Sequence, residues 1–257
     1  MIEVKNIYKS FDNKEVLKDI STVFDKGKTN LIIGRSGSGK TVLMKTLIGL
    51  IRPESGEILY DQRNLISMNK NELKNLRREM GMLFQGSALF DSMTVLENVM
   101  FPLTMFTHDS KKDREKRAKF CLERVNLMDA DTMFPGEISG GMMKRVAIAR
   151  AIALNPDYLF CDEPNSGLDP KTALLIDDLI HDITKEYHIT TVINTHDMNS
   201  VMNIGEKIMF ISEGEKAWEG TKDEIMTSTN KKLNDFIFAS ELFKKVKEVE
   251  SLFNEEG

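Results

Sequence analysis

The chain has 257 residues, of which 41% are hydrophobic and 29% charged, with a formal net charge of −5 at pH 7. This length can bury a sizeable core, so we expect one domain with lobes. The acidic balance argues against a nucleic-acid partner, because such proteins normally present a basic surface. The cysteines, Cys121 and Cys161, lie far apart in apolar surroundings, which predicts buried free thiols in a reducing compartment.

The start of the chain, MIEVKNIYKSF, has neither a basic leader nor an apolar signal segment. No apolar stretch approaches the ~18 residues that a membrane-spanning helix needs. We therefore expect a cytoplasmic protein, whose membrane role, where it has one, comes through a partner.

A phosphate-binding loop is predicted near residue 34. Residues 29–34 indicate a buried strand, a helical period follows over 40–50, and GRSGSGKT between them matches the P-loop pattern G-x-x-x-x-G-K-[ST]. The glycines let successive N–H groups point at phosphate oxygens, beside the positive end of the helix. We expect Lys40 to reach the β- and γ-phosphates and the Thr41 hydroxyl to bind Mg²⁺.

Strands and helices then alternate, with one long helical interruption. Residues 52–60 predict a turn that enters a strand, and 79–85 predict an apolar strand ending at Gln85. Residues 86–156 are mostly helical. Buried strands are expected again at 158–163, 190–196 and 207–211, with a helix over 170–187. This alternation predicts a parallel α/β sheet that carries an inserted helical lobe.

The helical lobe contains a second potential anion site, in ISGGMMKRVAIARA. Ser139 can cap the helix that follows, and the amides of Gly140 and Gly141 are unobstructed. A simple helix cap is the alternative. The lobe cannot easily fold back over its own P-loop, so we expect two chains, arranged head to tail, to offer this helix start to each other's γ-phosphate.

Acidic residues end the strand at 158–163. In an open parallel sheet ligands bind at the carboxyl edge, so Asp162 faces Mg²⁺ there and Glu163 can polarise an attacking water. Capping of a helix is the alternative role for Glu163. His196 ends the next strand at the same edge, where an imidazole N–H can hold the γ-phosphate, although a lone histidine after a strand is more often structural.

These motifs resemble those of the ABC (ATP-binding-cassette) ATPases, and the resemblance extends to about residue 227. The P-loop, Gln85 in LFQGSALF, ISGGM, LFCDEP, SGLDP and His196 are similar to the family's Walker A, Q-loop, signature, Walker B, D-loop and H-loop. The resemblance implies an ATPase with a P-loop NTPase fold, comprising a RecA-like core at 1–85 and 157–227, an antiparallel β subdomain and a helical subdomain at 86–156. Residues 228–257 are expected to form a C-terminal helical tail.

The resemblance also implies the roles of single residues. Glu163, His196 and Gln85 are the expected catalytic residues, and Thr41, Gln85 and Asp162 the expected Mg²⁺ ligands. Phe11 is expected to stack on adenine, with Tyr8 as the reserve. The expected ATP contacts are Phe11, Gly34, Arg35, Ser36, Gly37, Ser38, Gly39, Lys40, Thr41, Val42, Ser139, Gly140, Gly141 and Asp169.

One departure points to a subtype. The common signature is LSGGQ, whereas this chain has Ile138 and Met142, and methionine cannot supply the hydrogen bonds of glutamine. That methionine, with QGSALFDSMTVLENVMFPL, is similar to the Mla-type (MlaF-like) ATPases that move phospholipids between bacterial membranes. The subtype implies a homodimer on the cytoplasmic side of the inner membrane, an MlaE-like permease, an MlaD-like MCE-domain lipid carrier and a STAS-domain regulator.

Two alternatives remain open at this point: an importer for another cargo, and a soluble ABC-type assembly ATPase, since both need the same nucleotide residues. The tail is a further open point. Leu242, Val246, Val249 and Phe253 form an apolar stripe at helical spacing, which packs on its own domain or on a partner.

Overall fold

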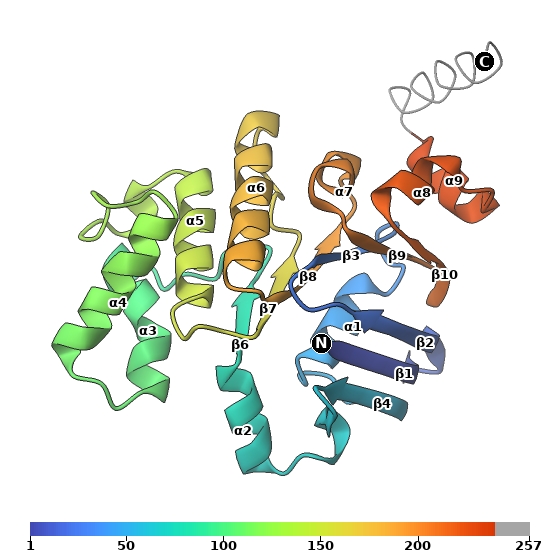
Figure 1. Ribbon diagram of the computed structural model, residues 1–257, viewed down its shortest axis with the longest axis horizontal. Helices are drawn as coiled ribbons and strands as arrows, with labels where there is room; N and C mark the ends of the chain where they lie inside the picture. The colour runs from blue at the N-terminus through green and yellow to red at the C-terminus, as the bar shows by residue number, and fades with distance from the viewer. Residues whose placement is uncertain (240–257) are drawn as a thin grey trace.

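The computed structural model of the protein describes residues 1–239, which form two β-sheets and a lobe of helices (Figure 1). The larger sheet has the strand order β10-β9-β3-β8-β7-β6. Its strands, in that order, are Glu215–Gly220, Lys207–Ser212, Thr29–Ile33, Thr190–Thr195, Tyr158–Asp162 and Met80–Leu83. All neighbours pair in parallel except β10, which is antiparallel to β9. The prediction of an α/β fold around a parallel sheet is confirmed.

The smaller sheet is antiparallel and has the order β2-β1-β4-β5. Its strands, in that order, are Lys14–Phe24, Ile2–Phe11, Ser55–Tyr60 and Arg63–Asn64. Asp12 and Asn13 join β1 to β2 with φ angles of 47° and 62°, the left-handed pair that a tight hairpin turn requires. Figure 1 shows β1, β2 and β4 of this sheet next to α1.

Nine α-helices connect or cover the strands of residues 1–239. In chain order they are α1 Lys40–Leu47, α2 Lys70–Arg78, α3 Val95–Phe106, α4 Lys111–Arg124, α5 Gly140–Ala151, α6 Pro170–Glu186, α7 Met198–Ile204, α8 Lys222–Thr227 and α9 Lys231–Ile237. Helices α3, α4 and α5 form the lobe at one end of the molecule in Figure 1. Polar side chains mark several helix starts, such as the capping box of Thr94 and Glu97 on α3.

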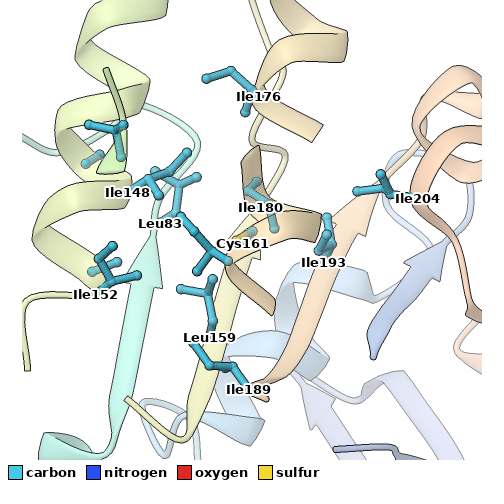
Figure 2. Close-up of a cluster of buried hydrophobic side chains, with 14 of the residues drawn as sticks. Leu83, Ile148, Ile152, Leu159, Cys161, Ile176, Ile180, Ile189, Ile193 and Ile204 are labelled. Atoms are coloured by element: carbon cyan, nitrogen blue, oxygen red, sulfur yellow. The ribbon is translucent and has the colours of Figure 1, made fainter. Parts of the chain in front are cut away.

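Two hydrophobic clusters lie on opposite faces of the larger sheet, because successive side chains of a strand point to opposite faces. On one face, Leu31 and Ile33 pack with the helical lobe, α6 and α7; on the other, Ile32 packs with α1 and the antiparallel sheet. Figure 2 shows part of the first cluster, where Ile148, Cys161 and Ile180 meet between α5, the sheet and α6. The lobe therefore shares its core with the sheet.

Both cysteines are buried and free, as expected. Burial is the largest cause that raises the pKa of the Cys121 thiol to about 11, and it raises that of Cys161 further. A thiol with a raised pKa carries little of the reactive thiolate at neutral pH, so these two side chains act as apolar core residues.

Some boundaries differ from the sequence prediction. The strand expected at 79–85 ends at Leu83, because the chain leaves the sheet in a turn in which Ser87 and Ala88 are left-handed. The helix that Ser139 caps ends at Ala151, four residues before Asn155, whose φ is 53°. The apolar stripe predicted at 242–253 lies outside the described residues.

Candidate functional site

A cavity of about 1160 Å³ opens at the carboxyl ends of four parallel strands. The loops after β3, β6, β7 and β8 all reach it, as expected for the ligand crevice of an open parallel sheet. Its lining residues are Val16, Arg35, Ser36, Gly37, Gly39, Lys40, Thr41, Val42, Gln85, Glu163, Asn165, Ser166, Gly167, Thr195, His196, Asp197, Met198, Asn199, Phe236, Ile237 and Ala239.

The loop between β3 and α1 is shaped by glycine. Gly39 has a φ of 110°, and a Cβ there would lie 2.9 Å from the carbonyl oxygen of Val16. At Gly34, with a φ of 153°, a Cβ would lie 2.3 Å from the carbonyl oxygen of Ile211. Gly39 is also the N-cap of α1 and has no side chain to bond the first amides of the helix. These amides remain available for an anion at the positive end of the helix.

Lys40 is the first residue of α1, and its side chain folds into this loop. It is 6% exposed, and its Nζ donates to the carbonyl oxygens of Gly34 at 2.8 Å and Arg35 at 3.2 Å. Burial lowers the pKa of Lys40, while the negative charges of Glu163 and Asp162 oppose that change. The ammonium group is thus held inside the loop and faces the acidic edge of the sheet.

That acidic edge lies where β7 ends. Asp162 accepts a hydrogen bond of 3.0 Å from Nδ2 of the buried Asn194 on β8. Glu163 adopts a left-handed φ of 47°, and its Oε1 lies 3.0 Å from Nδ1 of His196. The N-cap of the next helix, α6, is Asp169, so Glu163 does not cap it. The His196 side chain is 63% exposed, which is unlike a histidine that serves the core.

Gln85 lies in the loop after β6, and side chains of α5 bind the backbone of this loop. The side-chain Nε2 of Gln85 donates to Ser166 Oγ at 3.3 Å. The backbone carbonyl oxygen of Gln85 accepts a hydrogen bond from Nζ of Lys144, a buried lysine of α5. Arg150, also on α5, donates to the carbonyl oxygens of Ser87 and Ala88 at 2.7 Å each. A movement of α5 relative to the sheet would therefore displace this loop.

The second anion motif lies on the helical lobe. The Ser139 hydroxyl caps α5 by accepting from the amide of Met142 at 3.3 Å, and Ser139 and Gly140 are exposed. Neither these residues nor Gly141 line the cavity at the P-loop. Asp169 is also exposed; hydrogen bonds from Thr172, above all from its side chain, lower the pKa of Asp169. A single chain therefore does not bring the two anion motifs together.

The remaining expected nucleotide residues differ in whether they line this cavity. Arg35, Ser36, Gly37, Thr41 and Val42 line the cavity, whereas Ser38 lines a smaller pocket beside it. Phe11 and Tyr8 are exposed by 43% and 37% and do not line the cavity.

Several residues at the cavity were not anticipated from the sequence. Asn165 and Ser166 follow Glu163, and Asp197 and Asn199 follow His196. Their position directly after a strand that ends at the site is the signal that could have identified them. Phe236, at the end of α9, carries no such signal, since its place at the cavity depends on how α9 packs.

Comparison with known proteins identifies the family. A family model described as "ABC transporter" matches residues 17–166. The probable ribonucleotide transport ATP-binding protein mkl of Mycobacterium leprae is 38% identical over 238 residues, which cover 92% of this chain and 68% of that protein. The methionine import ATP-binding protein MetN of Clostridioides difficile is 38% identical over 237 residues, covering 92% and 74%.

The intermembrane phospholipid transport system ATP-binding protein MlaF of Haemophilus influenzae is 35% identical over 237 residues, covering 92% of this chain and 90% of that protein. Among solved structures, a dimeric bacterial ABC transporter cassette matches with a TM-score of 0.79 and 34% identity, over 86% of this chain and 99% of that one. Its dimeric post-hydrolysis state, bound to ADP and Pi, matches with a TM-score of 0.78 and 33% identity over the same shares. Within residues 1–239, no helix has both the length and the apolar character needed to cross a bilayer.

Proposed function

The chain belongs to the ABC transporter family and is the ATPase subunit of such a transporter, and we propose that it drives phospholipids between bacterial membranes, maintaining outer-membrane lipid asymmetry. The observation that carries the ATPase chemistry is one cavity lined by the P-loop, Lys40, Glu163 and His196. Basic and acidic groups meet there at the edge of a parallel sheet, where a nucleotide phosphate and its attacking water need them.

In this proposal the P-loop amides and Lys40 bind the β- and γ-phosphates. Glu163 is the general base that takes a proton from the attacking water, a role worth roughly 10²–10⁴ in rate. The 3.0 Å contact between Glu163 and His196 supports a paired role, in which the imidazole orients the carboxylate and holds the γ-phosphate.

We propose that Thr41, Gln85 and Asp162 hold a Mg²⁺ ion, which would neutralise the developing phosphate charge. Their donor atoms are a hydroxyl, an amide oxygen and a carboxylate, the hard oxygen ligands that Mg²⁺ prefers. Residues 1–239 contain no cluster of three or more His, Cys, Asp or Glu side chains suited to a metal. Mg²⁺ is commonly bound by one or two carboxylates together with substrate phosphates.

We further propose a homodimer in which each chain completes the other's site. Ser139, Gly141 and Asp169 lie outside the cavity of their own chain, and Ser139 and Asp169 are exposed. A second, antiparallel copy would bring the capped start of α5 to the γ-phosphate, where free amides stabilise negative charge. The dimeric form of the similar cassette structure supports this arrangement. Adenine would stack on the exposed ring of Phe11, or of Tyr8.

The choice of phospholipid as cargo rests on relatives. The aligned part of the chain accounts for 90% of MlaF of Haemophilus influenzae, against 74% of the MetN protein and 68% of the mkl protein, so of these three relatives MlaF is the one that the alignment covers most completely. Met142 in the signature supports the same subtype. Import of methionine, or transport of a ribonucleotide, is the second candidate, favoured by the slightly higher identity of 38%.

The proposed partners are an MlaE-like permease, an MlaD-like MCE-domain carrier and a STAS-domain regulator, with the chain peripheral on the cytoplasmic side of the inner membrane. The loop around Gln85 offers a docking point for the permease, since Phe84 and Phe90 are 40% and 41% exposed on either side of it. Lys144 and Arg150 tie this loop to α5, so docking there can reach the nucleotide site.

Two experiments test the proposal. Glu163→Gln should bind ATP, fail to hydrolyse it and accumulate as a dimer in size-exclusion chromatography with ATP and Mg²⁺, whereas the exposed control Glu123→Gln should behave as wild type.

For the cargo, the chain is tagged in its native cells and purified in detergent with its membrane partners. The complex in vesicles should then move a fluorescent phospholipid in an ATP-dependent manner; transport of methionine or a nucleotide instead would overturn the phospholipid assignment.

A further inference from the structure

A buried carboxyl group lies directly behind the nucleotide site, and nothing in the ATPase chemistry above uses it. Asp177 is in the middle of α6 and is 1% exposed. Within residues 1–239 it forms no ion pair with a lysine or arginine. A buried charge without a cation is costly, so its hydrogen-bond partners must account for its presence.

Those partners come from two other segments that reach the cavity. Asn165, two residues after Glu163, donates through Nδ2 to Asp177 Oδ1 at 2.7 Å and to Ser200 Oγ at 3.0 Å. Ser200 lies on α7 and is 1% exposed, and its side chain acts on the Asp177 carboxyl so as to lower the pKa of Asp177. The three side chains thus close a small buried network between the loop after β7, α6 and α7.

This network fixes Asn165. The other amide atom of Asn165, Oδ1, is buried and accepts no hydrogen bond within the described residues. The two bonds donated by Nδ2 are therefore the polar contacts that hold the side chain, and Asp177 accepts the shorter one. Loss of the acceptor on Asp177 would leave the Asn165 side chain without its main anchor.

The loop that Asn165 anchors carries site residues on both sides. Glu163 is held in a left-handed conformation, which is costly for a residue with a Cβ and persists only where the surroundings enforce it. The amide of Ser166 donates to the Glu163 carbonyl at 3.1 Å, and Ser166 Oγ accepts from Gln85. Anchoring Asn165 therefore constrains the backbone between the proposed general base and the contact to Gln85.

Resting on the proposed role of Glu163, we propose that Asp177 is a positioning residue for ATP hydrolysis, whose carboxylate holds Asn165 and thereby the loop that carries Glu163. The negative charge makes Asp177 the stronger acceptor, since hydrogen bonds to an ionised group are roughly twice as strong as neutral ones. Protonation of Asp177 removes that advantage and loosens the loop. Hydrolysis by the wild type should accordingly decline at acid pH as Asp177 takes up a proton.

The groups that face Asp177 set the pH of that change. Burial is the largest cause that raises the pKa of Asp177 to about 6. The bonds from Asn165 and Ser200 oppose it, and the charges of Asp197, at the start of α7, and Asp178, on α6, add to it. The buried Cys161 thiol on β7 is a further titratable neighbour, and its pKa is raised above all by burial and also by Asp177 itself.

The test measures ATP hydrolysis by the full chain with saturating Mg²⁺-ATP between pH 5.5 and 8.5. Asp177→Asn keeps the shape and an acceptor oxygen, so its kcat at pH 8 should remain within about fivefold of wild type, while the decline near pH 6 disappears. Asp177→Leu removes the acceptor and should lower kcat about tenfold or more with little change in the KM for ATP. Asp182→Asn, which alters an exposed carboxylate of the same helix, is the matched control and should follow the wild-type profile.

A double-mutant cycle decides whether Asp177 acts through Asn165. In the Asn165→Ala background, Asp177→Leu should cause no further loss of kcat; multiplicative losses would overturn the proposal, as would a decline near pH 6 that survives in Asp177→Asn. Asp177→Leu is compared only if its thermal unfolding matches wild type, and Asp177→Asn with Asn165→Ala otherwise completes the test. Hydrolysis that survives Glu163→Gln refutes the ATPase site itself, whereas normal Asp177 variants beside an inactive Glu163→Gln refute this inference alone.

Discussion

Replacing Asp177 with asparagine should also change how the stability of the protein depends on pH. The carboxyl is 1% exposed, and burial raises its pKa from 3.8 to about 6. A raised pKa means that the folded protein binds this proton more tightly than the unfolded chain. The bound proton therefore stabilises the folded protein fully at a pH below 3.8, the pKa of the unfolded chain. This contribution to the free energy of unfolding is lost as the pH rises through about 6. Asparagine does not titrate, so Asp177→Asn lacks this dependence.

The magnitude follows from the two pKa values. The pKa of Asp177 is 3.8 in the unfolded chain and about 6 in the folded protein. At about 1.4 kcal/mol for each pKa unit, this difference changes the free energy of unfolding by about 3 kcal/mol in total. Between pH 4.5 and 7.5 about 2 kcal/mol of this is lost, because the unfolded chain is already mostly ionised at the lower limit. The free energy of unfolding of the wild type, relative to Asp177→Asn, should fall by that amount over this range.

Urea unfolding at four pH values measures this difference. The chain has a single tryptophan, Trp218, which packs against the larger hydrophobic cluster, so its fluorescence reports loss of the core. The comparison uses wild type, Asp177→Asn and the exposed control Asp182→Asn. If the wild-type and Asp177→Asn stabilities run parallel from pH 4.5 to 7.5, Asp177 does not titrate in this range, and the argument from burial is wrong.

Three further predictions concern the core, the P-loop and the loop after β6. Ile180 is fully buried on α6, so Ile180→Ala should cost about 2–5 kcal/mol in urea unfolding, whereas Leu174→Ala, on the exposed face of the same helix, should stay within about 0.5 kcal/mol. Gly39 and Gly37 have φ angles of 110° and 77°, so alanine strains the backbone at both positions, but only at Gly39 would its Cβ also lie 2.9 Å from a backbone oxygen. Gly39→Ala should therefore weaken binding of a fluorescent ATP analogue about tenfold or more and Gly37→Ala should weaken it less; equal effects would contradict the steric argument. Arg150→Lys loses the two-pronged contact to the loop after β6 and should slow permease-stimulated hydrolysis more than hydrolysis by the isolated chain, as measured in detergent with and without the membrane partner.

Much of the fold could be predicted because each element carries a local signal. Thr29–Ile33 is fully buried, as an uninterrupted apolar segment in a parallel sheet must be. The P-loop depends on glycines whose backbone angles other residues rarely adopt, so its position is visible in the sequence. Element ends were less predictable: the strand ends at Leu83, and the left-handed residues of the turn that follows are Ser87 and Ala88, which carry side chains, rather than the adjacent Gly86.

The candidate site divides in the same way. The residue types that bind phosphate and activate water follow strands directly, so the sequence alone indicated Lys40, Glu163 and His196 and the sheet edge on which they lie. Which of them touch was decided by tertiary structure: the His196–Glu163 contact joins residues 33 positions apart, from neighbouring strands. The Asp177 network had no sequence signal, because an aspartate in the middle of a helix is ordinarily a solvent-facing residue. Only the packing of α6 against α7 and the loop after β7 removes it from water, and burial without a cation is what gives that carboxyl its properties.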